Sequence, residues 1–268
     1  MKIICLTENT QGKTECGYEH GLCIYIETEK HKILADTGTS DMLLKNAEIL
    51  GIDLTKVDTV VLSHGHYDHS GGIIPFSEIN PNAKIYMHSS AGDDYYHGER
   101  YIGIDKRILS LPQVIFTESL TEIDSELSIF SEISGSRYRS KSNLSLTKRC
   151  QGNDVQDSFD HEQCLVINTE GKLILISGCA HNGILNILYK FSELYNREPD
   201  MVISGFHMMK KTDLDDEDIE IIKGTAHELA KMHTVFWSGH CTGKPAFDIM
   251  KDIMGDKLCE MHSGDVII

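Results

Sequence analysis

One run of seven residues, carrying three histidines and an aspartate, constrains this chain more than any other feature: His64-Gly65-His66-Tyr67-Asp68-His69-Ser70. It follows the apolar segment 57–62. The period of two in an extended segment points His64 and His66 the same way, whereas Asp68 and His69 lie on a turn and face a second point. Burying four such side chains without partners would cost too much free energy. The run therefore predicts a pair of divalent metal ions held by these residues.

Net charge limits the classes of partner. The chain has 268 residues and a formal net charge of -16, which repels DNA and RNA. No stretch approaches the roughly 18 apolar residues of a membrane span, and residues 1–13 lack the pattern of a secretory signal. We therefore expect a cytoplasmic protein that acts on a small molecule, without a nucleic-acid or membrane partner. The oligomeric state is left open.

Apolar and β-branched segments bounded by polar or glycine-containing turns indicate strands in both halves of the chain. They cover residues 2–6, 22–26, 33–35, 59–62 and 84–87, then 164–168, 173–177, 201–204 and 234–237. Helical patterns cover about residues 42–50, 71–79, 184–195, 215–232 and 245–254. Two halves that each run from strands to helices predict an α/β fold, with two sheets packed together between layers of helices: an αββα sandwich.

No proline- or serine-rich linker separates the halves, so we expect one domain over residues 1–268. Residues 89–160 are less regular and are expected to form an irregular insertion. Within them, the stretch between Ile133 and Asn153 has no acidic residue and contains Arg137 and Arg139. We interpret Arg137 and Arg139 as substrate-binding residues that orient an anionic, phosphorylated molecule. A solvated loop or hairpin is the alternative interpretation.

The seven-residue run resembles the HxHxDH motif of the metallo-β-lactamase superfamily, and the match is complete. The resemblance implies the αββα sandwich of that superfamily, with His64 and His66 on one ion and Asp68 and His69 on the other. Asp36, in Ala35-Asp36-Thr37-Gly38, resembles the superfamily aspartate that supports the metal loop by hydrogen bonding. Further segments are similar to the subfamily typified by the archaeal dihydropterin-ribofuranosylaminobenzene-phosphate synthase: residues 19–22, 177–181, 204–208 and 239–243.

Each ion needs a further ligand from the second half of the chain. His240 occupies the position at which the superfamily places the last histidine of the second site. For the first site we prefer His181 and keep His161 and Cys179 as rivals, because the bridging aspartate of the superfamily is missing and a cysteine stands there. Zinc is the preferred ion, and the ligand types leave iron and manganese open.

The resemblance and the ligand set together predict a hydrolase with a metal-activated hydroxide, acting on a small anionic or phosphorylated substrate. Asp68 would orient the nucleophile and His207 would protonate the leaving group, a structural role being the alternative for His207. His20 is expected to line the pocket. Other hypotheses are a synthase that joins a pterin diphosphate to an aryl amine phosphate, a non-catalytic metal-containing binder, and a diiron oxygen reductase. The last would need a flavin partner domain and more carboxylate ligands.

Overall fold

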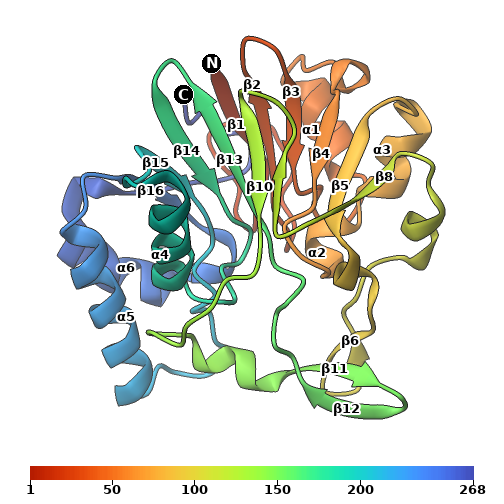
Figure 1. Ribbon diagram of the computed structural model, residues 1–268. Coiled ribbons are helices and arrows are strands. Elements are labelled where there is room, and N and C mark those ends of the chain that lie inside the picture. Colours follow the sequence, from red (N-terminus) through yellow and green to blue (C-terminus); the bar gives the residue numbers. More distant parts are fainter.

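Two β-sheets pack face to face at the centre of the molecule, and helices cover both outer surfaces (Figure 1). This arrangement is seen in the computed structural model, which describes residues 1–268. It confirms the predicted αββα sandwich.

The first sheet has six strands in the order β1-β2-β3-β4-β5-β8. Strands β1 to β3 are antiparallel, and β3, β4, β5 and β8 run parallel. Helices α1 (Met42–Ile49) and α3 (Ile73–Ile79) cover its outer face, and α2 (Tyr67–Ser70) is a single turn after β4. The strands are β1 (Lys2–Thr7), β2 (Cys23–Glu27), β3 (Lys32–Ala35), β4 (Thr59–Val61), β5 (Lys84–His88) and β8 (Val114–Thr117).

The second sheet has seven strands in the order β17-β16-β15-β14-β13-β10-β9. Strands β14 to β17 are parallel, and β13, β10 and β9 continue the sheet with antiparallel pairing. Helices α4 (Ile184–Tyr195), α5 (Asp216–Ala230) and α6 (Lys244–Met254) cover its outer face. The strands are β9 (Leu120–Glu122), β10 (Leu127–Phe130), β13 (Cys164–Thr169), β14 (Lys172–Ile176), β15 (Met201–Ile203), β16 (Val235–Ser238) and β17 (Leu258–Glu260).

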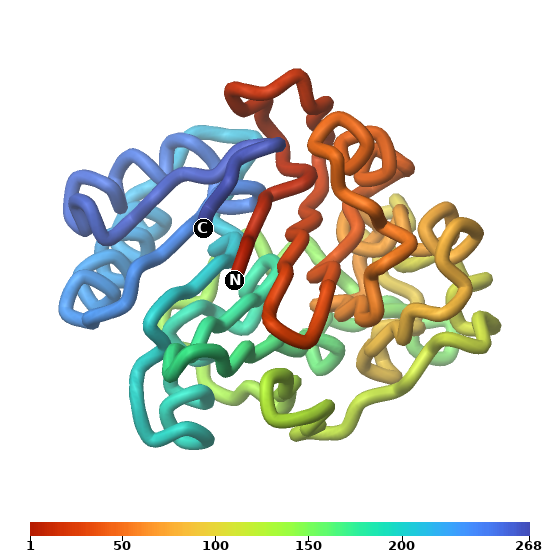
Figure 2. Tube along the Cα trace, turned by 90° about the horizontal axis from the view of Figure 1, so that it is seen from above, coloured from red at the N-terminus to blue at the C-terminus, as the bar shows by residue number.

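Three apolar clusters correspond to the three interfaces between layers. The central cluster joins the sheets and contains Ile24 and Ile33 from the first and Ile129 and Ile167 from the second, all fully buried. The other two lie between each sheet and its helices. The two chain ends lie close together in the view from above (Figure 2). The backbone N–H of Ile3 donates a hydrogen bond to the carbonyl of Ile268 at 3.0 Å. This pairing links the C-terminal segment to β1.

The segment 89–160 is not an irregular insertion throughout, and that prediction needs correction. Its strand β8 joins the first sheet, and β9 and β10 join the second. The remaining strands form a separate four-stranded sheet below the sandwich (Figure 1): β6 (Tyr95–His97), β7 (Arg100–Tyr101), β11 (Leu146–Cys150) and β12 (Asn153–Gln156). These strands have two to five residues and expose many polar side chains, so they carry little hydrophobic pattern. The expectation of one domain over residues 1–268 stays a prediction.

No helix of the structure combines the length and the apolar composition that crossing a membrane requires.

Candidate metal centre

The side chains that the sequence singled out gather at one edge of the sandwich, where strands of both sheets end. In open α/β sheets the carboxyl ends of parallel strands form the ligand-binding edge. The first sheet supplies Asp36 after β3, and His64, His66, Asp68 and His69 after β4; the second supplies Cys179 and His181 after β14, His207 after β15 and His240 after β16. Loops far apart in sequence therefore meet here because the two sheets place their strand ends side by side.

Three of these positions have a left-handed backbone, which residues other than glycine rarely adopt. Asp36, His207 and His240 have φ angles of 59°, 49° and 48°. Such strained positions persist only where the surroundings hold them, and they cluster at functional sites.

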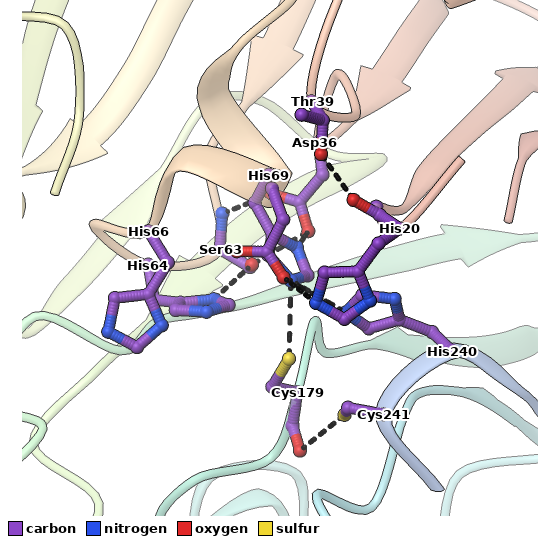
Figure 3. A network of polar contacts seen from close by, with 12 residues as sticks. His20, Asp36, Thr39, Ser63, His64, His66, His69, Cys179, His240 and Cys241 are labelled. Atoms are coloured by element: carbon purple, nitrogen blue, oxygen red, sulfur yellow. Dashed lines mark hydrogen bonds and ion pairs between the residues drawn. The ribbon is translucent and has the colours of Figure 1, made fainter. Parts of the chain in front are cut away.

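Asp36 is the hub that orients the metal loop (Figure 3). Its carboxylate accepts hydrogen bonds from the backbone N–H and the hydroxyl of Ser63, both at 2.7 Å, and contacts Nδ1 of His69 at 2.6 Å. The Ser63 hydroxyl also contacts Nδ1 of His64 at 2.8 Å. Because the hydroxyl donates to Asp36, it accepts from His64, and both histidines turn their Nε2 atoms to the centre of the site. A Cβ at Gly178 would lie 2.1 Å from the Ser63 hydroxyl, so only glycine fits there.

His64, His66 and His181 form what we call the imidazole half of the centre. Their rings are buried, with centroids 4.6 to 4.9 Å apart, and none of their Nε2 atoms has a hydrogen-bond partner. Burial lowers the pKa of His66 to about 3, and it lowers the pKa of His64 and His181 well below their ordinary value. In His64 and His181 the Nδ1 proton is donated to Ser63 and Asn143, which leaves a lone pair on each Nε2 atom. Buried polar atoms without partners are rare, and converging lone pairs fit a cation.

The loop that carries His181 is fixed from behind. Nδ1 of His181 lies 2.9 Å from the amide oxygen of Asn143, and the Asn143 amide nitrogen donates to the His181 carbonyl at 2.7 Å. The buried carboxylate of Glu162 accepts the backbone N–H groups of His181 and Asn182 at 2.6 and 2.8 Å. Phe159 stacks on the ring of His181, with centroids 4.4 Å apart and planes 4° from parallel. The ring has one orientation, and its free nitrogen points to His64 and His66.

Asp68, His69 and His240 form the carboxylate half. Nε2 of His69 lies 3.1 Å from Nε2 of His240, and both lie within 3.8 Å of an Asp68 carboxylate oxygen. Burial acts to lower the pKa of His69, but Asp36 and Asp68 outweigh it and raise that pKa to about 9. Burial alone would raise the pKa of Asp68, but His69 and the hydrogen bond with His20 bring it below its ordinary value. Without a cation, these pKa shifts favour a protonated His69 beside an ionised Asp68.

His240 and His20 are positioned by the loop after β1. Nδ1 of His240 lies 2.8 Å from the amide oxygen of Asn9, and the backbone N–H of His240 donates to Glu8. His20 stacks on His240 with centroids 5.2 Å apart, and its Nε2 lies 3.3 Å from Asp68. The structure thus brings His20, expected only to line the pocket, into contact with a candidate ligand.

Cys179 lies between the two halves (Figure 3). Its sulfur lies 3.2 Å from Nε2 of His69, and ligand atoms within 4.8 Å of one another group it with His64 and His181 on one side and with His69 and His240 on the other. The sequence treated Cys179 and His181 as rivals, but they lie together beside His64. Cys179 stands where one atom can face both halves.

His161, the other rival, is placed differently. Its Nδ1 accepts the backbone N–H of Gly65 at 2.9 Å, and its Nε2 lies 3.2 Å from the buried Asp157 carboxylate. Both ring nitrogens are occupied within the protein, so His161 supports the metal loop from outside and has no lone pair left for an ion.

His207 borders the imidazole half. Its ring centroid lies 4.0 Å from that of His181, and both of its ring nitrogens are buried without a hydrogen-bond partner. Its backbone N–H donates to the sulfur of Cys241 at 3.2 Å. A partnerless imidazole at this place can exchange a proton with a bound molecule.

Arg137 and Arg139 have different partners in the structure. The guanidinium of Arg137 lies 3.1 Å from Glu228 of α5, on the surface. Arg139 instead donates to the side-chain oxygen of Asn182 at 3.2 Å, next to His181. Only the second of the two lies beside the centre.

Sequence reasoning missed the residues that orient the candidate ligands: Glu8, Asn9, Ser63, Asn143, Asp157 and Glu162. Asn143 and Asp157 lie in the segment 89–160 that looked irregular, and Asn9 follows the first strand. The sequence offered a signal only for Asn9 and Ser63, which follow the predicted strands 2–6 and 59–62. A metal-ligating histidine commonly passes its other ring N–H to such a partner.

The chain is similar to several known proteins. Residues 16–128 match the Metallo-beta-lactamase superfamily. The whole chain is 30% identical to the 7,8-dihydropterin-6-methyl-4-(beta-D-ribofuranosyl)-aminobenzene-5'-phosphate synthase of Methanocaldococcus jannaschii, covering 100% of this chain and 96% of that protein. Among solved structures, Tm1679, described as a metal-dependent hydrolase of the beta-lactamase superfamily, is 33% identical with a TM-score of 0.84, covering 100% of this chain and 98% of that one. YhfI from Bacillus subtilis is 16% identical with a TM-score of 0.60, covering 99% and 97%, and supports the fold alone.

The expectation of a hydrolase is wrong. The curated relative that matches from end to end is a synthase, which agrees with the first of the other hypotheses. The motif misled because the same imidazole and carboxylate ligands hold cations whether those cations activate water or bind a leaving group, so fold and ligands do not fix the reaction. Tm1679 is described as a hydrolase, but that description applies to Tm1679 and does not assign an activity to this chain.

The centre fits divalent cations on its own chemistry. Imidazole nitrogens, one carboxylate and one thiol converge from two sheets, and three of the nitrogens, those of His64, His66 and His181, have no other partner. With the full-length identity of 30% and the αββα sandwich, these observations lead to one conclusion: the chain belongs to the metallo-beta-lactamase superfamily.

Proposed function

We propose that this protein is a synthase that joins a pterin carrying a methylene diphosphate to an aryl amine phosphate. The observation that carries the proposal is the end-to-end similarity to a synthase whose name describes such a product. The bond balance is simple. The amine nitrogen bonds to the methylene carbon, the carbon–oxygen bond to the diphosphate breaks, and one amine proton must be taken up.

We propose that His64, His66 and His181 would hold one divalent cation and Asp68, His69 and His240 a second, with Cys179 facing both. Zinc is the preferred ion because a thiol belongs to the donor set, and iron or manganese are the alternatives. When bound, such cations supply charge neutralisation for a departing diphosphate. The support from this chain is the set of Nε2 atoms of the imidazole half that no protein group satisfies.

His207 is the residue that we propose takes the amine proton. Its two ring nitrogens lack partners, and its ring lies against His181. A general base must reach the proton that it removes, and no hydrogen bond inside the protein has to be broken for His207 to do so. Asp68, whose pKa lies below its ordinary value, contributes a fixed negative charge on the opposite side of Cys179.

The test is a coupling assay with a pterin-methyl diphosphate and a ribofuranosyl aminobenzene phosphate, followed by mass spectrometry of the product and measurement of released diphosphate. We expect equal amounts of coupled product and diphosphate. His66→Ala should abolish turnover while keeping the far-ultraviolet circular dichroism of the wild type, and His233→Ala, at an exposed position, should leave turnover unchanged. Diphosphate release without a coupled product would refute the proposal.

A further inference from the structure

The arginines of this chain fall into two groups. Of the six, four lie within 4.0 Å of a carboxylate: Arg107 with Asp105, Arg137 with Glu228, Arg149 with Asp154 and Arg197 with Asp200. The other two, Arg100 and Arg139, have no carboxylate within that distance. In a chain with a net charge of -16, two arginines without an acidic partner are unusual enough to need an explanation.

Arg139 is held in place and keeps most of its donors free. Its guanidinium carbon lies 5.8 Å from the centre of the Phe159 ring, and Phe159 stacks on His181. One of its N–H groups donates to Asn182, whose own side chain donates to Glu162 at 2.9 Å. A guanidinium has five N–H groups, so several remain for a ligand.

Arg100 contacts a second aromatic ring, that of Tyr67. Its guanidinium carbon lies 4.7 Å from the centre of the Tyr67 ring, and Tyr67 directly precedes the candidate ligand Asp68. Tyr67 packs against the apolar cluster of the small sheet, which consists of Tyr95, Ile102, Leu146 and Phe159. Both arginines therefore contact aromatic rings of one cluster: Arg139 contacts Phe159, which stacks on His181, and Arg100 contacts Tyr67, which packs against that cluster.

We propose that Arg139 and Arg100 are the residues that recognise the phosphate groups of the substrates, and that Arg137 is not. The assignment of two phosphate-bearing substrates depends on the proposed function. The planar fork of arginine matches phosphate oxygens bidentately, and a guanidinium without an acidic partner has no ion pair to break first. Arg137 and Arg149 are excluded because each already forms an ion pair, Arg137 with Glu228 and Arg149 with Asp154.

Direct binding tests the proposal without turnover. The purified protein is titrated calorimetrically with ribose 5-phosphate, and with ribose as the neutral match. We expect Arg139→Met and Arg100→Met each to weaken binding of the phosphate about 10- to 100-fold, the range for hydrogen bonds to a charged group. Arg137→Met and Arg149→Met are the matched controls and should bind like the wild type. Ribose should bind equally to all five proteins.

Equal weakening by Arg137→Met and Arg139→Met, or no weakening by Arg100→Met and Arg139→Met, would overturn the proposal. Should a methionine variant melt below the wild type, Arg139→Lys and Arg100→Lys decide, because they keep the charge and lose the fork; intermediate affinity supports the proposal and wild-type affinity refutes it. Phosphate binding that depends on both arginines in a protein that forms no carbon–nitrogen bond would support this inference and refute the proposed synthase.

Discussion

The two halves of the metal centre solve the problem of buried polar atoms in different ways. In the carboxylate half, Asp68, His69 and His240 contact one another, and His69 holds a proton between two carboxylates. In the imidazole half, the Nε2 atoms of His64, His66 and His181 have no partner. The comparison teaches that the first half can satisfy itself without an ion, whereas the second half needs one. The following predictions test this difference.

The largest effect should come from the imidazole half. His181→Ala removes one of three partnerless nitrogens, and we expect loss of one metal ion per chain and a fall in turnover of at least about 100-fold, since losing a ligand should exceed the 10- to 100-fold cost of losing its outer partner. His161→Gln should keep its metal, because both nitrogens of His161 are already occupied. Metal analysis of the two variants provides the measurement. Equal metal loss in both would remove the distinction between ligand and support.

Cys179→Ser tests whether the halves share a donor. Because the sulfur faces both groups of histidines, we expect both ions to bind more weakly, by about 10-fold or more, the scale of perturbing a metal site. Chelator competition would measure the two affinities. If they stay at wild-type values, Cys179 is a packed thiol and the halves are independent.

A matched pair of variants compares the outer partners of the two halves. Asn143 orients His181, and Asn9 orients His240, each through the Nδ1 atom. Asn143→Ala should weaken the ion of the imidazole half alone, and Asn9→Ala that of the carboxylate half alone, by about 10- to 100-fold. Affinities from competition with a chromogenic chelator check this, and loss of the same ion in both variants would contradict it.

The smallest effect is a difference in pH dependence between the halves of the metal-free protein. The pKa of His66 is lowered from 6.5 to about 3, so its contribution to stability is full above pH 6.5 and is lost as the pH falls toward 3. The pKa of His69 is raised from 6.5 to about 9, so its contribution is full below pH 6.5 and is lost as the pH rises through 9.

Each slope should be at most about 1.4 kcal/mol per pH unit, the value for one proton. Urea unfolding of chelated protein at several pH values gives the measurement. His66→Gln should flatten the acidic side and His69→Gln the alkaline side. The same side flattening in both variants would show that the halves do not differ in this way.

The sequence predicted what is local and strongly patterned. Most strands and helices of the two large sheets follow apolar runs with clear ends, so the helix 184–195 was placed correctly to the residue and others within a few residues. Strands β8, β9, β10 and β17 of these sheets were not predicted. The small sheet could not be predicted, because its strands are short and partly exposed, and because β6 pairs with β11, which lies about 50 residues further along the chain. Nor could the roles of His181 and His161 be separated, since only the fold reveals that Asp157 and Gly65 occupy both nitrogens of His161.

The central claim is that this cluster of side chains holds divalent cations, and metal analysis of the protein purified without added metal tests it most directly. We predict two divalent ions per chain in the wild type and one in His66→Ala at an unchanged fold. A folded wild-type protein that forms the carbon–nitrogen bond while carrying no divalent ion, and that keeps this activity in the presence of a chelator, would contradict the account.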